Sequence, residues 1–200
     1  MKKCILVIFI TITISISAFA QGFYFDIGLG LGMGWTKIDG TDFVDYLKSY
    51  GGSVDEIAID LGLKAGYGPF GNIPIYVVGE LSGMAHRIWD SSNYIQFNSY
   101  LIGPGVIFYP IPLIQISSSA GYSFVGNQTD LPVKMYDSKI GYAFNFSVAV
   151  DLGKRNHGLL IGLKYFYANN KLETSNVDQA SSMIGLFIKY AYRKKAPSLF

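Results

Sequence analysis

Residues 23–35, FYFDIGLGLGMGW, alternate strictly between two kinds of side chain. Every odd position is apolar, and the even positions are Tyr24, Asp26, Gly28, Gly30, Gly32 and Gly34. This period of two indicates a β-strand with one apolar face. Glycines on the other face fit the crowded inside of a narrow closed barrel, where backbones approach closely. The stretch therefore predicts a barrel strand whose apolar side chains point outward.

The chain begins with Lys2 and Lys3, and an apolar run then ends in Ala18-Phe19-Ala20. A positive start, a hydrophobic middle and small residues at a cleavage site are typical of a secretory signal peptide. The alternative is a membrane anchor, but an apolar run of about 16 residues is short for a span of roughly 20. We predict a cleaved signal peptide over 1–20 and one mature domain over 21–200.

Composition limits the classes of protein to which the mature chain can belong. Loss of the signal peptide removes Cys4 and two lysines, so that 14 of the 16 basic residues remain against 14 acidic ones. This balance argues against nucleic-acid binding. Half of the residues are apolar and only 15% are charged, against about 25% in ordinary soluble proteins. Because no later stretch resembles a spanning helix, we expect a large core or a closed barrel in lipid.

Eight alternating segments follow one another along the chain, at 23–35, 56–68, 75–88, 94–109, 113–126, 139–152, 159–168 and 181–193. Gly103-Pro104-Gly105 interrupts the fourth segment and predicts a bulge or bend there. Short connections at 69–73, 110–112 and 153–158 would share one end of the fold, and the longer loops 38–54, 127–138 and 169–180 the other. This arrangement is typical of an all-β, eight-stranded antiparallel up-and-down transmembrane β-barrel.

The first long loop carries the pattern of a short helix. Thr41-Asp42 supplies a capping residue, a stripe of Phe43, Tyr46, Leu47 and Tyr50 follows, and Gly51-Gly52 ends it. We expect this helix to pack on the rim of the barrel, because a loop helix usually buries its apolar stripe for stability. A lid or a contact surface is the alternative.

Four charged residues are predicted to meet inside the barrel. An antiparallel pairing that sets Asp26 opposite Lys64 also sets the glycines of the first strand opposite Ala58, Asp60 and Gly62. Glu80 would lie on the next strand at the height of Lys64, and Lys189 would reach Asp26 when the barrel closes. Because lone buried charges are costly, we expect a structural plug of balanced charge. A gated polar pathway is the alternative.

Two further sets of residues follow from the same alternation. The other polar side chains predicted to face the lumen are Asp60, His86, Gln96, Asn98, Gln115, Asn145, Asp151 and Lys164. The aromatic residues predicted to lie at the two membrane interfaces are Phe23, Trp35, Tyr67, Trp89, Tyr109, Tyr165, Tyr167, Tyr190 and Tyr192. Two aromatic belts of this kind match the interfaces of a lipid bilayer.

The mature chain as a whole resembles the small eight-stranded outer-membrane barrels, namely the OmpA transmembrane domain, OmpX, OmpW and the opacity-type proteins. This resemblance rests on the strand pattern and the alternating loop lengths. It implies a location in the outer membrane of a Gram-negative-type cell, reached through export and barrel-assembly machinery. It also implies a structural, adhesive or surface-interaction role, with any extracellular ligand bound by the loops 38–54, 127–138 and 169–180.

Sites for other chemistry are weak or missing in the sequence. We predict neither a metal site nor a cofactor, because the two histidines, His86 and His157, lack companion ligands at metal-binding spacing. A narrow channel for small or apolar solutes is the second hypothesis for function. A lipid-modifying enzyme is the third, since Glu80, Ser82 and His86 share one face of a strand. We expect no enzymatic activity, because polar inward residues are usual in such a lumen. A soluble ligand-binding barrel would need an apolar inside, which the inward charges oppose.

Overall fold

The structure is a computed structural model. It describes residues 22–51, 53–70, 73–91, 93–132, 135, 138–153, 156–173 and 177–193. The predicted signal peptide, residues 1–20, and the residues after Arg193 lie outside this part of the chain.

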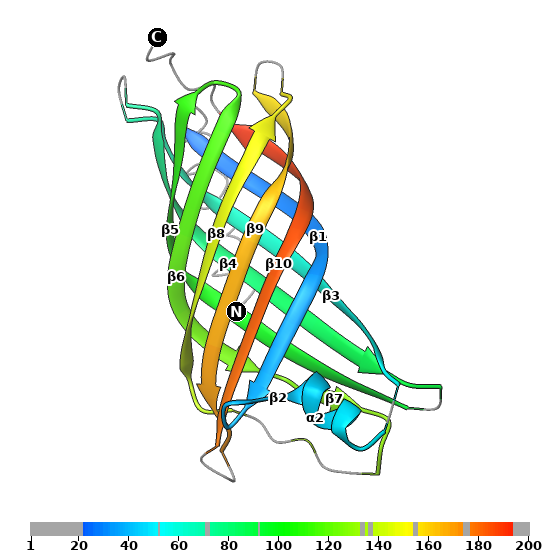
Figure 1. Ribbon diagram of the computed structural model, residues 1–200. Helices are drawn as coiled ribbons and strands as arrows, with labels where there is room; N and C mark the ends of the chain where they lie inside the picture. Colours follow the sequence, from blue (N-terminus) through cyan, green and yellow to red (C-terminus); the bar gives the residue numbers. More distant parts are fainter. Residues whose placement is uncertain are drawn as a thin grey trace, which may run out of the picture.

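Eight long strands form a closed antiparallel barrel (Figure 1). They are β1 (Phe23–Ile38), β3 (Asp55–Tyr67), β4 (Ile75–Trp89), β5 (Tyr94–Ile111), β6 (Ile114–Val125), β8 (Gly141–Asp151), β9 (His157–Lys171) and β10 (Asp178–Arg193). Each long strand pairs with its neighbour along the chain, and β10 pairs with β1 to close the ring. The predicted all-β, up-and-down barrel is confirmed. Closure satisfies the backbone of every wall strand without leaving a sheet edge.

The register between β1 and β3 is the predicted one. Asp26 faces Lys64, and Gly28, Gly30 and Gly32 face Gly62, Asp60 and Ala58. Because side chains in a strand alternate between faces, this register gathers the glycines and charges on one side and the apolar residues on the other.

The first long connection holds the predicted helix. Two residues, β2 (Thr41–Asp42), lead into α2 (Phe43–Ser49), and the Asp42 carboxylate accepts a hydrogen bond from the Val44 N–H at 3.0 Å. A second two-residue strand, β7 (Gln128–Thr129), pairs with the start of β5. Figure 1 places α2, β2 and β7 together at one end of the barrel, hereafter the loop end; the opposite end is the short-turn end. Within the described chain, no helix has the length and apolar character needed to cross a membrane.

Two details of the predicted strand pattern are wrong. β9 runs to Lys171 and β10 starts at Asp178, so the connection predicted at 169–180 is shorter. The polar residues there continue the ladder, with Asn170 facing Gln179, because pairing extends beyond the apolar belt. Of the bulge or bend predicted at Gly103–Gly105, the bulge is absent, since the register with β6 is the same at Ile102 and Gly105; the register shift lies between Phe108 and Ile111.

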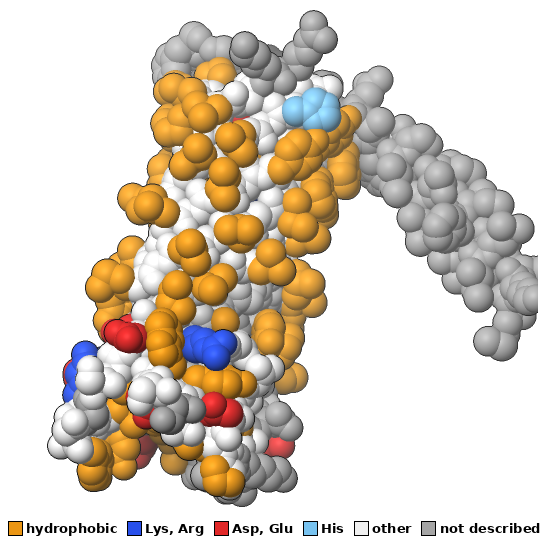
Figure 2. Space-filling model, turned by 90° about the vertical axis from the view of Figure 1, so that its right-hand side faces the viewer, with side chains coloured by type: hydrophobic (Ala, Val, Ile, Leu, Met, Phe, Trp, Pro, Cys, Tyr) orange, Lys and Arg blue, Asp and Glu red, His pale blue; other side chains and the backbone are white. Residues whose placement is uncertain are grey.

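The outside of the barrel is apolar and the inside is polar. Leu29, Leu61 and Phe144 expose 51%, 63% and 38% of their surface, whereas Asp26 and Lys64 each expose 1%. Figure 2 shows hydrophobic side chains scattered over most of the wall, with acidic and basic residues gathered near the loop end of that face. A wall of this kind is suited to acyl chains, because exposed apolar patches of such extent mark contact surfaces.

The face assigned to β5 is wrong in the sequence prediction. Phe97 and Leu101 are buried inside the barrel, whereas Gln96 pairs with the exposed Arg87 and Asn98 with Ala85, both on the outward parity. Asn98 is nevertheless covered on that side, and its amide donates to the Gly126 carbonyl. Tyr109 shares the parity of Phe97 and is also buried inside, so it is not an interface aromatic. The prediction failed because it assumed a polar lumen throughout, whereas apolar side chains such as Phe97 and Leu101 lie among the buried polar residues toward the loop end.

Candidate functional site: the filled lumen

A network of tyrosines and charges crosses the lumen at the short-turn end. The Gln115 side-chain amide donates to the hydroxyls of Tyr24, at 2.9 Å, and Tyr109, at 2.7 Å. Tyr24 lies on β1 and Gln115 on β6, which are opposite in the ring of strands. Arg193 Nε donates to the Tyr109 hydroxyl and to the Asp151 carboxylate, both at 2.9 Å. β10 and β5 are likewise opposite, so these bonds close the barrel from wall to wall.

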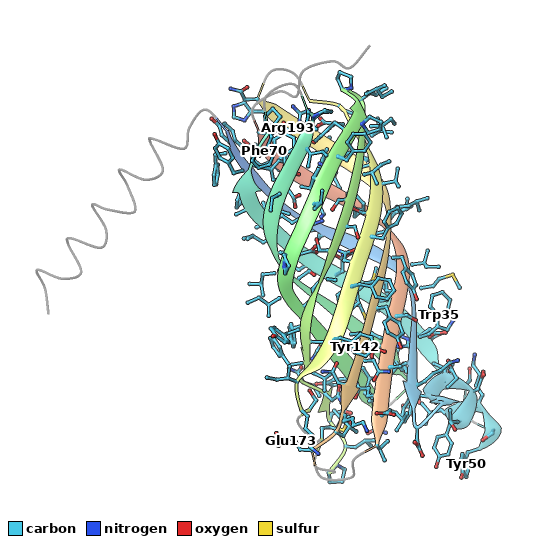
Figure 3. All side chains as sticks on the ribbon, turned by 90° about the vertical axis from the view of Figure 1, so that its left-hand side faces the viewer. Trp35, Tyr50, Phe70, Tyr142, Glu173 and Arg193 are labelled. Atoms are coloured by element: carbon cyan, nitrogen blue, oxygen red, sulfur yellow. The ribbon has the colours of Figure 1, made fainter. Side chains whose placement is uncertain are left out.

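Arg193 marks this end in Figure 3, where it lies beside Phe70 and far from Tyr50 and Glu173 at the loop end. Its guanidinium also lies 4.8 Å from the ring centroid of Tyr109. Together with the ion pair to Asp151, this contact buries the positive charge beside both an anion and an aromatic face.

A second layer of charges lies deeper in the barrel. Lys64 Nζ is 3.3 Å from Glu80 Oε2, and Lys189 Nζ is 3.4 Å from Asp26 Oδ1. Lys164 forms an ion pair with Asp60. These six side chains are buried, and each charge has a partner of opposite sign. Such pairing offsets the large cost of removing charges from water.

Several contacts of this layer also reach across the lumen. Lys64 on β3 donates to the Ser117 hydroxyl on β6. Asn145 on β8 donates to Glu80 on β4. In each case two other strands separate the partners along the shorter way around the wall. The side chains therefore meet in the middle of the barrel and fill it, as small eight-stranded barrels do.

The glycines of β1 leave the space that these side chains occupy. A Cβ on Gly30 would lie 2.1 Å from Asp60 Oδ1, and one on Gly28 would lie 2.3 Å from Lys189 Cγ. Both distances are far below van der Waals contact. The period-two glycine series thus serves the charge layer directly, because any larger residue would displace a paired side chain.

Apolar residues fill the next layer toward the loop end. A buried cluster contains Ala58, Met84, Leu101, Ala143, Phe166, Ala168 and Met183. Beyond it, His86 is fully buried, with Nδ1 3.0 Å from Thr36 Oγ1 and Nε2 2.9 Å from Glu56 Oε2. These contacts join β1, β3 and β4 through one imidazole.

Helix α2 packs over the loop end of the barrel. Val44 of α2 forms a buried cluster with Ile88 of β4 and Phe97 of β5. The ring of Phe43 meets that of Phe97 edge-on, with centroids 4.9 Å apart. The helix therefore packs on the rim, the alternative that the sequence favoured, and it buries its apolar side against the inside of the β4–β5 hairpin.

The structure places most of the predicted lumen residues inside the barrel. Asp60, His86, Gln115, Asn145, Asp151 and Lys164 are all buried there. Gln96 and Asn98 are the two exceptions described above. Ser82 is buried on the same strand as His86, but the imidazole contacts Thr36 and Glu56, and the Ser82 hydroxyl has no hydrogen-bond partner among the described residues. The contact between nucleophile and base that an enzyme would need is therefore not formed by this pair.

Several residues of the network were missed from the sequence, and all of them follow the inward parity of their strands. Tyr24 is two residues from Asp26, and Arg193 is four from Lys189. Tyr76 and Thr36 also alternate with outward apolar residues. The signal was therefore available on these strands, because each of the missed side chains shares the parity of a residue already predicted to lie inside or of the glycines of β1. Among the described residues, no group of three His, Cys, Asp or Glu side chains is placed to hold a metal ion.

The remaining predicted interface aromatics stand on the outer wall near its two ends. Phe23, Tyr67, Tyr190 and Tyr192 lie near the short-turn end, and Trp35, Trp89, Tyr165 and Tyr167 near the loop end. Trp35 projects outward from the wall in Figure 3. The apolar band between these two sets is the part of the wall with the composition of a lipid-facing surface.

Comparison with known proteins agrees with this geometry. The fold is similar to Ail, the attachment invasion locus protein of Yersinia pestis, solved with the heparin analogue sucrose octasulfate: 16% identity, TM-score 0.51, covering 84% of this chain and 99% of Ail. It is also similar to Neisserial surface protein A, at 16% identity and TM-score 0.50, covering 86% of this chain and 96% of that one. No family model and no curated protein sequence matches the chain. The chain has the fold of the small eight-stranded outer-membrane β-barrels, the group of OmpA and OmpX.

Proposed function

We propose that the protein is a non-conducting barrel of the outer membrane that interacts with its surroundings through the loop end. Export by the signal peptide over 1–20 and insertion by barrel-assembly machinery belong to this proposal. The observation that carries it is the filled lumen, where hydrogen bonds link opposite walls through Gln115, Tyr109 and Arg193. A protein with this interior offers its loops and outer wall, and not a pore, for function.

The loop end then faces outward from the cell. Short turns on the periplasmic side and longer connections outside are the rule for bacterial barrels. The described part of the outer connections includes α2, whose Tyr46 and Tyr50 are exposed and lie edge-on at 5.1 Å. Exposed tyrosines on a rigid support are common in protein–protein contacts, because they provide large contact areas at a small entropy cost. We therefore place the contact surface on α2, on the loops 38–54 and 127–138, and on the shorter connection 172–177 between β9 and β10.

The charge of this end narrows the class of partner. Acidic side chains outnumber basic ones among its described residues: Asp39, Asp42, Asp45, Asp55, Glu56, Asp90, Asp130, Glu173 and Asp178 stand against Lys37, Lys48, Arg87, Lys139 and Lys171. Ail has been solved with a polysulfated sugar, but an acidic surface repels such a ligand. We propose a neutral or basic protein surface as the partner.

Ion conductance through the barrel tests this proposed function most directly. We expect the folded barrel to show no steady single-channel conductance in a planar bilayer, because the paired side chains leave no continuous water path. Heat-modifiable migration on a gel confirms that the same sample is folded, and a porin with a water-filled lumen serves as the conducting control. Steady conductance that is lost on substitution of lumen residues would favour the narrow channel and contradict the proposal.

A further inference from the structure

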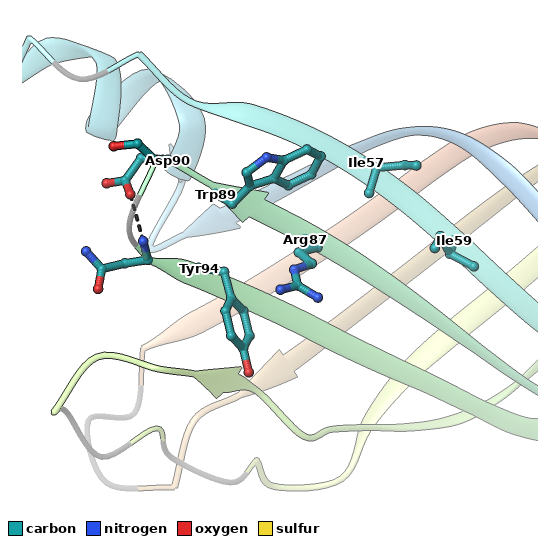
Figure 4. A pocket seen from close by; sticks show the side chains of 8 residues that line it. Ile57, Ile59, Arg87, Trp89, Asp90 and Tyr94 are labelled. Carbon is teal, nitrogen blue, oxygen red and sulfur yellow. Dashed lines mark hydrogen bonds between the residues drawn. The ribbon is translucent and has the colours of Figure 1, made fainter.

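A cleft lies on the outer wall near the loop end, where the apolar band meets the charged rim. It has a volume of about 480 Å³ and is lined by Ile57, Ile59, Arg87, Trp89, Asp90, Ser91, Asn93 and Tyr94. Figure 4 shows Arg87 and Tyr94 side by side beneath Trp89. The Arg87 guanidinium carbon is 4.0 Å from the centroid of the Tyr94 ring. The cation is thus held on an aromatic face at the mouth of the cleft.

Arg87 forms no ion pair with any described acidic residue. Two carboxylates near this cleft accept hydrogen bonds from backbone N–H groups. Asp90, in the turn between β4 and β5, accepts from the Asn93 N–H at 2.8 Å, and Asp130, after β7, accepts from the Tyr94 N–H at 2.8 Å. The neighbouring outer-wall amides bond to each other, with Gln96 donating to Asn98 at 2.8 Å. Arg87 is therefore an exposed cation that rests on the Tyr94 ring and has no ion pair among the described residues.

An apolar groove continues from the cleft along β4. A second hollow of about 430 Å³ shares Ile59 with the cleft. A third, of about 1000 Å³, shares Leu63 and Leu81 with the second and extends to Tyr67 and Phe70 near the short-turn end. The three hollows follow one another as a path over the outer wall, with Ile59, Leu63 and Leu81 standing between neighbouring hollows.

Small residues on β4 form the floor of this path. Its outward positions include Gly79, Gly83 and Ala85 beside the larger Val77 and Leu81. In contrast, the outward positions of β8, and those of β1 from Phe23 to Trp35, are all large and apolar. Taller side chains of β3 and β5, such as Leu61 and Tyr100, flank this floor. The Tyr100 ring lies over Gly83, and Leu81 stands between Gly79 and Gly83. The hollows therefore lie on the lipid-facing side of the wall, and the positive charge of Arg87 is at their loop end.

We infer that this groove binds one membrane lipid with a phosphate-bearing headgroup, with the phosphate on Arg87 and an acyl chain along the floor of β4. The inference rests on the membrane placement in the proposed function. Guanidinium groups bind phosphate oxygens through two parallel N–H donors. Charge complementarity thus identifies the headgroup, and continuity with the lipid-facing wall identifies the rest of the ligand. A lipid of the outer leaflet is the occupant, because Arg87 stands at the loop end.

The two tryptophans of the chain provide a built-in comparison. Trp89 lines the cleft, whereas Trp35 lies at the same end of the barrel on β1, with Lys37 two residues away. Trp35→Phe leaves Trp89 as the reporter, and Trp89→Phe leaves Trp35. Each variant is reconstituted in phosphatidylcholine vesicles that contain a minor fraction of brominated phosphatidic acid or, in parallel, brominated phosphatidylcholine, and quenching of tryptophan fluorescence is measured.

At Trp89 we expect phosphatidic acid to associate about tenfold more strongly than phosphatidylcholine, the ratio given by one added charge-assisted hydrogen bond. Trp35 should show a ratio near unity. Arg87→Gln should bring the Trp89 ratio to unity, Arg87→Lys should retain part of it, and the matched surface variant Lys37→Gln should leave it unchanged. Gel migration checks that every variant is folded.

Equal ratios at the two tryptophans, or a Trp89 ratio that survives Arg87→Gln, would overturn the lipid site and leave the membrane placement intact. Absence of quenching at both tryptophans by either lipid would overturn the membrane placement and, with it, the lipid site. The two failures are thus distinguishable within one experiment.

Discussion

Lys64→Ala should lower the free energy of unfolding by about 3–5 kcal/mol, the cost of removing one partner of a buried ion pair and leaving the other charge buried. Lys64 is buried, is 3.3 Å from Glu80 and donates to Ser117 across the lumen. Removing its ammonium leaves the Glu80 carboxylate buried without its closest cation, while Asn145 remains as a hydrogen-bond donor. Urea titration of the barrel folded in lipid vesicles, followed by gel migration, measures the effect.

Two controls separate the lost charge pair from lost side-chain volume. The double variant Lys64→Met with Glu80→Gln should recover most of the stability, because a neutral pair of similar volume carries no uncompensated charge. Lys37→Ala removes an exposed lysine of β1 and should change stability by no more than about 0.5 kcal/mol. If Lys64→Ala were as mild as Lys37→Ala, the charge layer would not stabilise the barrel.

Gly32→Ala should impair closure of the barrel, at or above the roughly 1–3 kcal/mol that overpacking costs in a core. Its Cβ would lie 2.1 Å from the Ile184 carbonyl oxygen and 2.5 Å from Gly185 Cα. Both atoms belong to the backbone of β10, the strand that closes the ring against β1, so no side-chain rotation relieves the clash. The fraction of heat-modifiable barrel after refolding and its urea midpoint measure this effect.

Gly62→Ala is the matched control, since Gly62 also lies on the inward face, on the neighbouring strand β3. A Cβ there would meet Ser82 Cβ at 3.6 Å, an ordinary contact. The free energy of unfolding of Gly62→Ala should stay within about 0.5 kcal/mol of that of the parent protein or rise slightly, because alanine restricts the unfolded chain. Equal effects at Gly32 and Gly62 would show that the glycines of β1 are not needed for close packing against β10.

The barrel and much of its interior could be predicted because alternation along a strand carries two kinds of information. The period fixes the secondary structure, and the phase fixes the face. On β1 both are unambiguous, since glycine and apolar residues alternate without exception from Ile27 to Trp35. The position of Asp26 then sets the register with β3, because only one pairing places it opposite Lys64 and keeps all apolar residues outside.

β5 shows where this reasoning fails. Near its start, polar Gln96 and Asn98 lie outside while apolar Phe97 and Leu101 lie inside. The inversion follows from tertiary structure: Phe97 packs under α2, and Leu101 joins a buried apolar cluster with residues of several other strands. Gly103 and Gly105 share the inward parity of β5, as the glycines of β1 do, but Gly79 and Gly83 of β4 point outward, so glycine alone does not assign the face.

The long-range partners inside the lumen depend on closure and could not be read from the pattern of any one strand. Contacts such as that of Arg193 with Tyr109 join strands on opposite walls. Their formation depends on strand tilt and on stagger around the ring, which a period of two does not encode. The same holds for the His86 contacts with Thr36 and Glu56, which join three strands.

The central claim is that apolar side chains of the wall face lipid while the charges lie inside. Single cysteines at Leu29, Leu61 and Phe144, each carrying a nitroxide in the reconstituted barrel, test it by collision with oxygen and with a water-soluble nickel chelate. Tyr50→Cys on the exposed α2 serves as the aqueous control. The account predicts that the three wall sites collide with oxygen and are shielded from the chelate, unlike position 50. Free access of the chelate to all three wall sites would contradict it.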